Sequence, residues 1–387
     1  MYKRVVVCGL LLVVLLACHG ANTPVPDTTP AVTPSLTAGR CGDGVCGPAE
    51  DAFNCPADCT VQGDTLPGDE IPPLYFFYAI HTHGTGDYLP YQDDSMQTID
   101  PQVADNMLAA IEGIAEVMDR YGARGTWEVV YGTATGLCTY QGPDHVFAQL
   151  QAAGHEIGAH AHQMEDIARA VSALQDDCGI VPQTNSGFIT FITSAQAGQQ
   201  QAMMSLALQN TLDLGMTAGT VNFSPGGGRN PFGALCDNQL GVGNDMWPQS
   251  GNLMFPWQPD YANQNVCAHD PTGEVVLVDH VSIEWLILPG SDGPPDVVGD
   301  AHFAQLQDWF DAALDYMAEQ RPQRVAAWGF VTHITEYAVG GHGEHGPDPQ
   351  ALAALDRFLA YVDTQRADGR VVYTTAAEIA DLVAAEQ

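Results

Sequence analysis

Between residues 74 and 387, the spacing of hydrophobic residues along the chain changes repeatedly. Short continuous apolar runs, such as 74–80, are typical of buried strands, and the three-to-four spacing in Pro101–Tyr121 is typical of an amphipathic helix that begins with proline. Further strands are predicted at 126–131, 155–160, 217–222, 274–279, 324–332 and 370–374. Further helices are predicted at 144–153, 195–214, 301–319 and 349–366, with one more at the end.

This alternation of buried strands with longer helices predicts an α/β fold, a (β/α)7-type distorted barrel with about seven parallel strands. In such barrels the loops at the carboxyl ends of the strands carry the functional site. Residues 223–267, rich in Gly, Asn, Pro and aromatic side chains, form a long excursion after one of those strands. Long excursions in a compact domain are usually functional.

The first 73 residues predict an exported protein. Residues 1–18 have a basic start, an apolar run and Leu-Leu-Ala-Cys, which resembles a bacterial lipobox with Cys18 as the lipidated residue. The alternative is an uncleaved anchor. Residues 19–40 read as a Pro/Thr-rich tether, 41–59 as a Cys-rich module and 60–73 as a linker before the barrel domain, 74–387. We therefore expect a cell-envelope or surface lipoprotein, with the outer membrane favoured, or otherwise a secreted protein.

The net charge limits the classes of molecule that this protein can bind. The formal net charge is −35 and Lys3 is the only lysine, so a nucleic acid is excluded as a partner and the membrane is reached through a lipid anchor only.

Without Cys8 and Cys18 eight cysteines remain, and an even number in an exported chain favours disulfides, two in the Cys-rich module and two in the large domain. The acids of the Cys-rich module are either calcium ligands or turn formers.

One motif carries a family resemblance. Gly-His-Glu-Ile-Gly-Ala-His at 154–160 is similar to the second motif of the NodB-type polysaccharide deacetylases, a carbohydrate esterase family. Residues 125–130, 223–231, 331–333 and 371–382 resemble further parts of that family, in order. The resemblance implies a NodB-like deacetylase barrel that uses a metal to remove acetyl groups from a carbohydrate.

Two ligand positions depart from the family pattern. Where the family has Asp-Asp-Gly at the end of the first strand, this chain has Thr82-His83-Gly84 preceded by His81. Where the family has its second metal-binding histidine, this chain has Met164. The family's usual base and two of its three usual ligands are therefore replaced.

Two His-x-His pairs are the candidate metal ligands. Alternate residues of a strand share a face, so His81 and His83 can point together, and His160 and His162 follow another strand. Four imidazoles suit zinc, copper or nickel better than magnesium or calcium, and zinc is the expected ion. The alternative is a set of hydrogen-bonded structural histidines.

The candidate catalytic residues come from neighbouring strands. Glu128 is the first choice for the general base because a carboxylate in an apolar strand requires a partner; Asp87, Asp93 and Asp94 are alternatives. The resemblance implies that His333 is the general acid. The alternative is that His333 is a structural histidine, hydrogen-bonded to a neighbour.

Substrate contacts are expected from the long excursion. Arg229 is implied by the resemblance, and Trp247 and Trp257 either stack on sugar rings or fix the loop. Asp279-His280 either orients a ligand or caps a turn, and the His-rich loop at 341–346 either binds metal or is solvated.

These features predict a metal-dependent hydrolase that removes acetyl groups from a carbohydrate. The alternative is a catalytically inactive carbohydrate- or metal-binding surface lipoprotein on the same barrel.

Overall fold

The computed structural model describes residues 71–83, 100–188, 199–222, 251–283, 297–339 and 345–386. The predicted signal, tether, Cys-rich module and most of the linker lie outside these residues, and so do Cys18, Asp87, Asp93, Asp94, Arg229 and Trp247. In the described part of the chain, no helix has the length and apolar character needed to cross a membrane.

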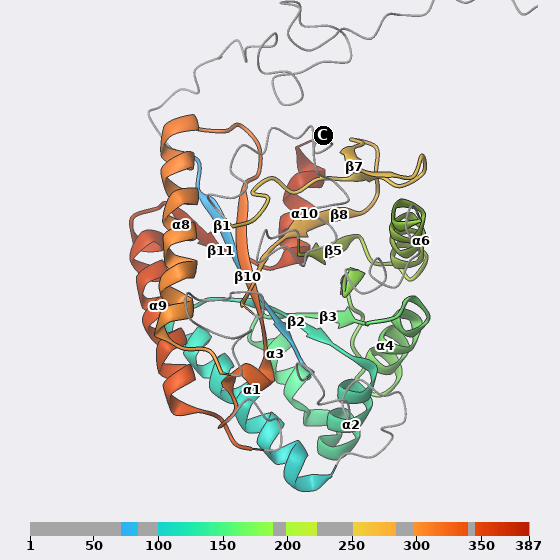
Figure 1. Cartoon of the computed structure of the whole chain (residues 1–387). Helices are drawn as coiled ribbons and strands as arrows, with labels where there is room; N and C mark the ends of the chain where they lie inside the picture. Colours follow the sequence, from blue (N-terminus) through green and yellow to red (C-terminus); the bar gives the residue numbers. More distant parts are fainter. Residues whose placement is uncertain are drawn as a thin grey trace, which may run out of the picture.

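Parallel strands alternate with helices along the chain (Figure 1). The strands are β1 (Leu74–His81), β2 (Gly125–Val129), β3 (Glu156–His160), β4 (Thr184–Ser186), β5 (Ala218–Val221), β6 (Pro259–Asp260), β7 (Asn265–His269), β8 (Val276–Asp279), β9 (Val281–Ser282), β10 (Ala327–His333) and β11 (Val371–Tyr373). The helices are α1 (Pro101–Tyr121), α2 (Tyr131–Gln141), η2 (Gly142–Asp144), α3 (Val146–Ala152), α4 (Met164–Asp176), α6 (Gln200–Asp213), α8 (Asp300–Gln320), η5 (Ile334–Tyr337), α9 (Pro349–Ala367) and α10 (Ala376–Ala385).

The main sheet closes on itself through one stretch of chain. Its strands follow the order β8-β5-β4-β3-β2-β1-β10-β9, all parallel, and β11 adds to the beginning of β1. Only His280 separates β8, which pairs with β5, from β9, which pairs with β10. Counted as one strand, β8 and β9 complete a ring of seven, which confirms the predicted (β/α)7-type distorted barrel.

The two faces of β1 separate the outside of the sheet from the inside of the barrel. Phe76, Tyr78 and Ile80 pack in the large core shared with the outer helices. Phe77 and Ala79 pack in a second core with β5, β8, β10 and α10. Because alternate strand residues share a face, His81 continues the inward row. The Phe77 ring fits there because its partner on β10 is Gly329, where an added Cβ would lie 2.3 Å from that ring.

Several helices differ from the sequence prediction. Tyr131 was expected at the end of a strand, but it begins α2. Six of the eleven residues of α2 are buried, so the helix lacks the clear division into an apolar and a polar face by which a helix is predicted. The prediction also lacked α4, which Met164 begins. By contrast, α1 has its predicted bounds, because Pro101 starts it and Gly122, with φ of 63°, ends it.

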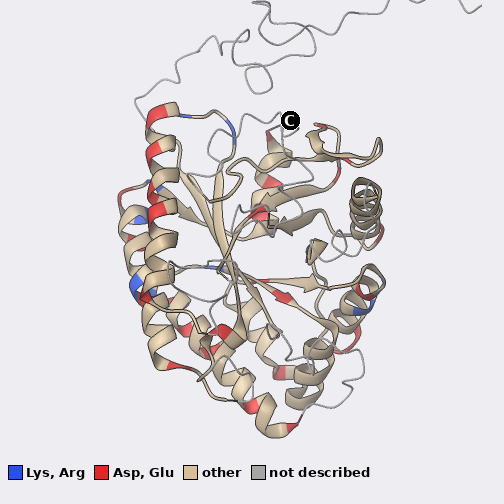
Figure 2. Ribbon diagram, viewed as in Figure 1, with Lys and Arg blue, Asp and Glu red and all other residues tan. Residues whose placement is uncertain are grey.

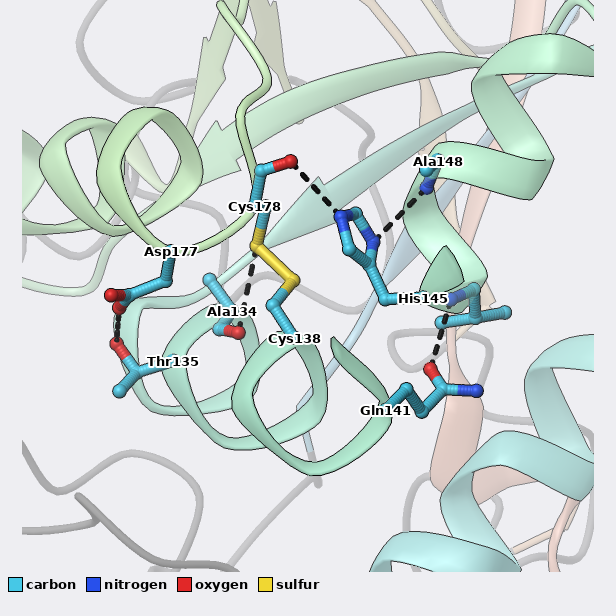
Figure 3. Close-up of a disulfide and its surroundings, with 9 residues drawn as sticks. Ala134, Thr135, Cys138, Gln141, His145, Ala148, Asp177 and Cys178 are labelled. Carbon is cyan, nitrogen blue, oxygen red and sulfur yellow. Dashed lines mark hydrogen bonds between the residues drawn. A yellow bond between two sulfur atoms is a disulfide. The ribbon is translucent and has the colours of Figure 1, made fainter. Parts of the chain in front are cut away.

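The barrel domain contains a disulfide, as the even number of cysteines predicts. Cys138 of α2 forms a disulfide with Cys178, which follows α4, and so joins the two helices (Figure 3). His145 lies beside it, with Nε2 2.9 Å from the Cys178 carbonyl oxygen and Nδ1 accepting from the Ala148 amide. Along the ribbon of the outer helices, the positions of acidic residues are more frequent than those of basic residues (Figure 2), in agreement with the net charge of −35.

Candidate metal and active site

Three neighbouring strands bring a carboxylate and two imidazoles to one level of the barrel. His81 on β1 is in register with Glu128 on β2 and with His333 on β10. Adjacent strands are only about 4.8 Å apart, so registered side chains on the same face touch. His81 Nε2 lies 2.6 Å from Glu128 Oε2, and His81 Nδ1 lies 3.2 Å from His333 Nε2. These contacts lie at the carboxyl ends of the strands, the mouth of the barrel.

Three more imidazoles lie against this group. His83 Nε2 is 2.9 Å from His160 Nε2, and His160 Nε2 is 3.3 Å from His162 Nε2. The rings of His81 and His160 have centroids 4.0 Å apart, and those of His83 and His333 are 4.8 Å apart. The structure therefore brings the four predicted ligands into one cluster, with His333 beside them.

The end of β4 encloses the cluster on another side. Ser186 is in register with His160, and its hydroxyl lies 2.6 Å from His160 Nδ1. The next residue, Gly187, has φ of 90°, and an added Cβ would lie 1.8 Å from the Ala161 carbonyl oxygen. Only glycine fits this close approach, which keeps Ser186 beside His160.

Burial controls the charges in the cluster. Desolvation lowers the pKa of His81 and His160 well below the usual value, and that of His162 to about 4, and neighbouring imidazoles lower each further. These three rings are therefore neutral near pH 7 and offer lone pairs.

Glu128 is fully buried, and desolvation raises its pKa. The Thr220 hydroxyl donates to Glu128 Oε1, and the nearby His280 acts against the rise. Asp279, just before His280, accepts from the Leu253 amide at 2.6 Å, so this carboxylate fixes local backbone.

His160 Nε2 lies close to the Nε2 atoms of both His83 and His162, and the three residues whose donor nitrogens all lie within 4.8 Å of one another are His81, His83 and His160. A single Nε2 atom makes one hydrogen bond, so His160 Nε2 cannot satisfy both neighbouring nitrogens, whereas one cation can accept a lone pair from each. Zinc–nitrogen bonds of about 2.0–2.1 Å place neighbouring nitrogens of a tetrahedral site about 3.3–3.4 Å apart. The His160–His162 contact of 3.3 Å matches this spacing, and the His83–His160 contact of 2.9 Å is shorter. Ser186 on the far nitrogen of His160 is the kind of partner that orients a ligand imidazole.

His81 occupies a different position from the other predicted ligands. Its donor nitrogen lies within 4.8 Å of those of His83 and His160, so this trio could also hold a metal. However, its two ring nitrogens already face Glu128 and His333. This arrangement suits a residue that links the carboxylate to the cluster.

The structure corrects the interpretation of Trp257. Its side chain is fully buried, and its indole N–H donates to the Val266 carbonyl at 3.0 Å. The ring therefore packs in the core and cannot stack on a sugar. The part of the predicted excursion that is described, from residue 251 onward, is largely buried and includes the β6–β7 hairpin.

Sequence reasoning missed three polar residues of the site: Ser186, Thr220 and Glu336. Ser186 and Thr220 lie on strands of three and four residues, and only the strand register shows that they face the cluster. Glu336 had a local signal, since it follows His333 by three residues at the start of a helical turn.

Comparisons with known proteins give structural neighbours only. No family model matches the sequence, and no curated protein matches it. A protein from Pseudomonas aeruginosa PAO1 described as a probable polysaccharide deacetylase is 13% identical, over 83% of this chain and 94% of that chain, with a TM-score of 0.48. Puue allantoinase is 15% identical, over 83% and 92%, with a TM-score of 0.47. The peptidoglycan deacetylase PdaC from Bacillus subtilis is 8% identical, over 81% and 93%, with a TM-score of 0.33. At these identities the likeness concerns the fold alone.

Proposed function

We propose that this chain is a metal-dependent hydrolase that removes acetyl groups from a carbohydrate, with zinc as the expected metal. The observation that carries the proposal is one continuous cluster at the barrel mouth. In it, a three-imidazole donor set touches a buried carboxylate–imidazole pair and a further imidazole. The similarity of residues 154–160 to the NodB-type motif supports the choice of acetylated carbohydrate as substrate.

His83, His160 and His162 would hold the metal through Nε2. Bound there, a divalent ion supplies polarisation of the acetyl carbonyl and a water of lowered pKa. Ser186 fixes the His160 ring from behind, so the donor set is arranged before any substrate arrives.

His81 accepts the proton from the attacking water, and Glu128 acts through His81. The Glu128 side chain is 0% exposed and its carboxylate faces His81 at 2.6 Å, whereas the His81 side chain is 13% exposed. A solvent molecule therefore reaches the imidazole before it reaches the carboxylate. Glu128 orients that ring and stabilises its protonated form.

His333 gives a proton to the departing sugar oxygen or nitrogen. Its Nε2 faces His81 Nδ1 across 3.2 Å, so the proton-accepting and proton-donating atoms lie side by side. A reacting group that lies beside both nitrogens can lose a proton to His81 and gain one from a protonated His333 without a large movement of either ring.

Export is part of the same proposal. The signal-like residues 1–18 and the lipobox cysteine, Cys18, would place the barrel on the cell envelope, where glycans are exposed. The strong negative charge favours neutral or cationic glycans over anionic ones.

The test compares His160→Ala with His269→Ala, a control at an exposed histidine on β7 outside the cluster. Metal per chain is measured by elemental analysis, and acetate release is measured on a panel of N- and O-acetylated glycans. We expect bound zinc and acetate release in the wild type and in His269→Ala, with both lost in His160→Ala.

Two results would oppose the proposal. Bound metal without acetate release on any glycan would favour the alternative, a metal- or carbohydrate-binding surface lipoprotein. Activity without any bound metal, unchanged in His160→Ala, would remove the metal from the mechanism.

A further inference from the structure

Thr133 is a buried threonine of α2 that has no part in the proposed reaction. It lies in the first turn of α2, the helix that follows β2. A threonine hydroxyl in a helix commonly donates to a carbonyl one turn back in the same helix. The Thr133 hydroxyl instead donates to the backbone carbonyl of Thr82, at 2.9 Å and 51 residues away along the chain. This contact joins α2 to the residue between His81 and His83.

The backbone at the end of β1 needs such a support. The strand ends at His81, so His83 lies two residues beyond it, where the register of the sheet no longer sets the backbone. The Thr82 amide still donates to the Glu128 carbonyl of β2, at 3.1 Å. The Thr82 carbonyl has the Thr133 hydroxyl as its partner. The peptide groups on the two sides of Thr82 are therefore held by different elements, β2 and α2.

The second of these peptide groups leads into His83. Because a peptide group is planar, the direction of the Thr82 carbonyl oxygen also sets the position of the His83 nitrogen and Cα atom. Holding that oxygen limits rotation of the plane, and with it the direction in which the imidazole leaves the backbone. The direction matters, since His83 Nε2 lies 2.9 Å from His160 Nε2, within a group of nitrogens that one metal ion would have to reach.

The helix that carries Thr133 is itself fixed at two other points. The disulfide between Cys138 and Cys178 joins α2 to the end of α4, and Arg169 of α4 lies over the Tyr131 ring, 4.5 Å from its centroid. Because α4 follows directly on the second His-x-His pair, α2 connects the backbone of the first pair with the helix after the second.

We propose that Thr133 is a positioning residue of the metal centre: its hydroxyl holds the Thr82–His83 peptide group and so directs the His83 imidazole at His160. This inference rests on the proposed function for the presence of a metal, and it requires no hydrolysis. His83 belongs to both ligand sets that the geometry allows, so the inference holds for either set. Without the hydroxyl, the peptide group rotates and the metal-binding position of His83 is occupied less often.

The test measures the affinity of the full chain, prepared without metal, for Co²⁺, whose visible absorption reports binding. Thr133→Val removes the hydroxyl and keeps the size and branching of the side chain. We expect its affinity for Co²⁺ to fall at least about tenfold, the lower end of the loss found when outer partners of a metal ligand are removed. Thr133→Ser keeps the hydroxyl and should bind Co²⁺ as the wild type does.

The matched control is Thr135→Val, on the same helix. The Thr135 hydroxyl donates to the Asp177 carboxylate at 2.8 Å, outside the metal centre. This variant should keep the wild-type affinity. Thr133→Ala is a second variant in case valine prevents folding, because it removes the hydroxyl and introduces no new contact; it should show the same loss as Thr133→Val.

Thermal unfolding, measured beside the affinity, separates positioning from a purely structural role. Lower thermal stability of Thr133→Val with unchanged affinity would overturn the inference, since the hydroxyl would then only satisfy a buried carbonyl. A loss of affinity in Thr133→Ser equal to that in Thr133→Val would also overturn it, because the hydroxyl would not be the cause.

The outcome for the hydrolase is separate. If the wild type binds Co²⁺ more tightly than Thr133→Val but releases no acetate, the proposed hydrolase fails and Thr133 remains the positioning residue. If acetate is released and the two proteins bind Co²⁺ equally, the hydrolase remains and the role of Thr133 is lost. A wild type that binds no Co²⁺ would remove the metal centre and the inference together.

Discussion

Two glutamates on neighbouring strands, near opposite ends of the barrel, have similar desolvation and different partners. Burial raises the pKa of Glu128, near the carboxyl end of β2, and raises that of Glu156, the first residue of β3, to about 7. Glu156 accepts from the Thr126 hydroxyl at 2.9 Å and from the Ala377 amide at 3.1 Å. Glu128 faces an imidazole instead.

The partners decide what each carboxylate can do. The neutral donors around Glu156 belong to β2, β4 and the first turn of α10, so this carboxylate joins three elements that stay in place. None of these donors titrates near neutral pH, so none of them can hold a proton taken from a substrate. His81 can both accept and release a proton, so Glu128 belongs to a group that can take part in a reaction. A raised pKa by itself therefore does not identify a catalytic carboxylate.

The largest expected effect separates these two residues by activity. In Glu128→Gln we expect kcat to fall by about 10²- to 10⁴-fold, because glutamine can accept from Thr220 but cannot stabilise a protonated His81. Steady-state acetate release and bound metal are measured together. Glu156→Gln is the control and should keep kcat within about twofold. Equal losses in the two variants would show that the comparison is wrong.

A smaller effect concerns stability against pH. The folded-state pKa of Glu156 is about 7, above its usual 4.5, so the folded chain binds this proton more tightly than the unfolded chain. The contribution to stability is complete below pH 4.5 and is lost as pH rises through 7. Glutamine imitates the protonated form. Relative to the wild type, Glu156→Gln should therefore gain up to roughly 3 kcal/mol of unfolding free energy between pH 4.5 and 8.

Urea unfolding of both proteins across this pH range measures the difference. Since both chains share every other titrating group, the difference isolates Glu156. A difference that does not change with pH, or that favours the wild type at high pH, would mean that its neighbours stabilise the ionised carboxylate.

The smallest effect tests the same end of the barrel without a charge change. Thr375 caps α10 by accepting from the Glu378 amide. Thr375→Ala should reduce the unfolding free energy by about 1 kcal/mol and leave acetate release unchanged. Thermal unfolding and the acetate assay check the two parts. A loss of activity in this variant would show that the two ends of the barrel are coupled.

The fold was largely predictable because its strongest signals are local. Buried strands and amphipathic helices have their own periods, and caps such as Pro101 and Gly122 set the ends of α1. The prediction failed where a helix lacks that pattern, as in α2, which is covered on most sides. Trp257 was misinterpreted for a related reason, since the sequence does not show whether an aromatic residue in a long excursion faces a sugar or the core.

The site was predictable as a set of residue types and less so as an arrangement. Two His-x-His pairs after predicted strands placed four imidazoles at the barrel mouth, and the structure brings those four together. Their separate tasks depended on contacts that the sequence does not contain. His81 faces Glu128 and His333, whereas His83 and His162 both face His160.

The sequence by itself determined the alternation of strands and helices, a barrel of about seven parallel strands and the excess of imidazoles at the strand ends. The structure decided which strands form the ring, since it includes β4, which was not predicted, and leaves β11 outside. The tertiary structure alone decided that His81 lies between Glu128 and His333, 47 and 252 residues away along the chain. That position is set by hydrogen-bond register between strands distant in sequence, and register follows from the packing of the whole barrel. The contact of Glu336 with the His333 backbone N–H is the intermediate case, because a local turn positions the carboxylate and the barrel gives the imidazole its partner.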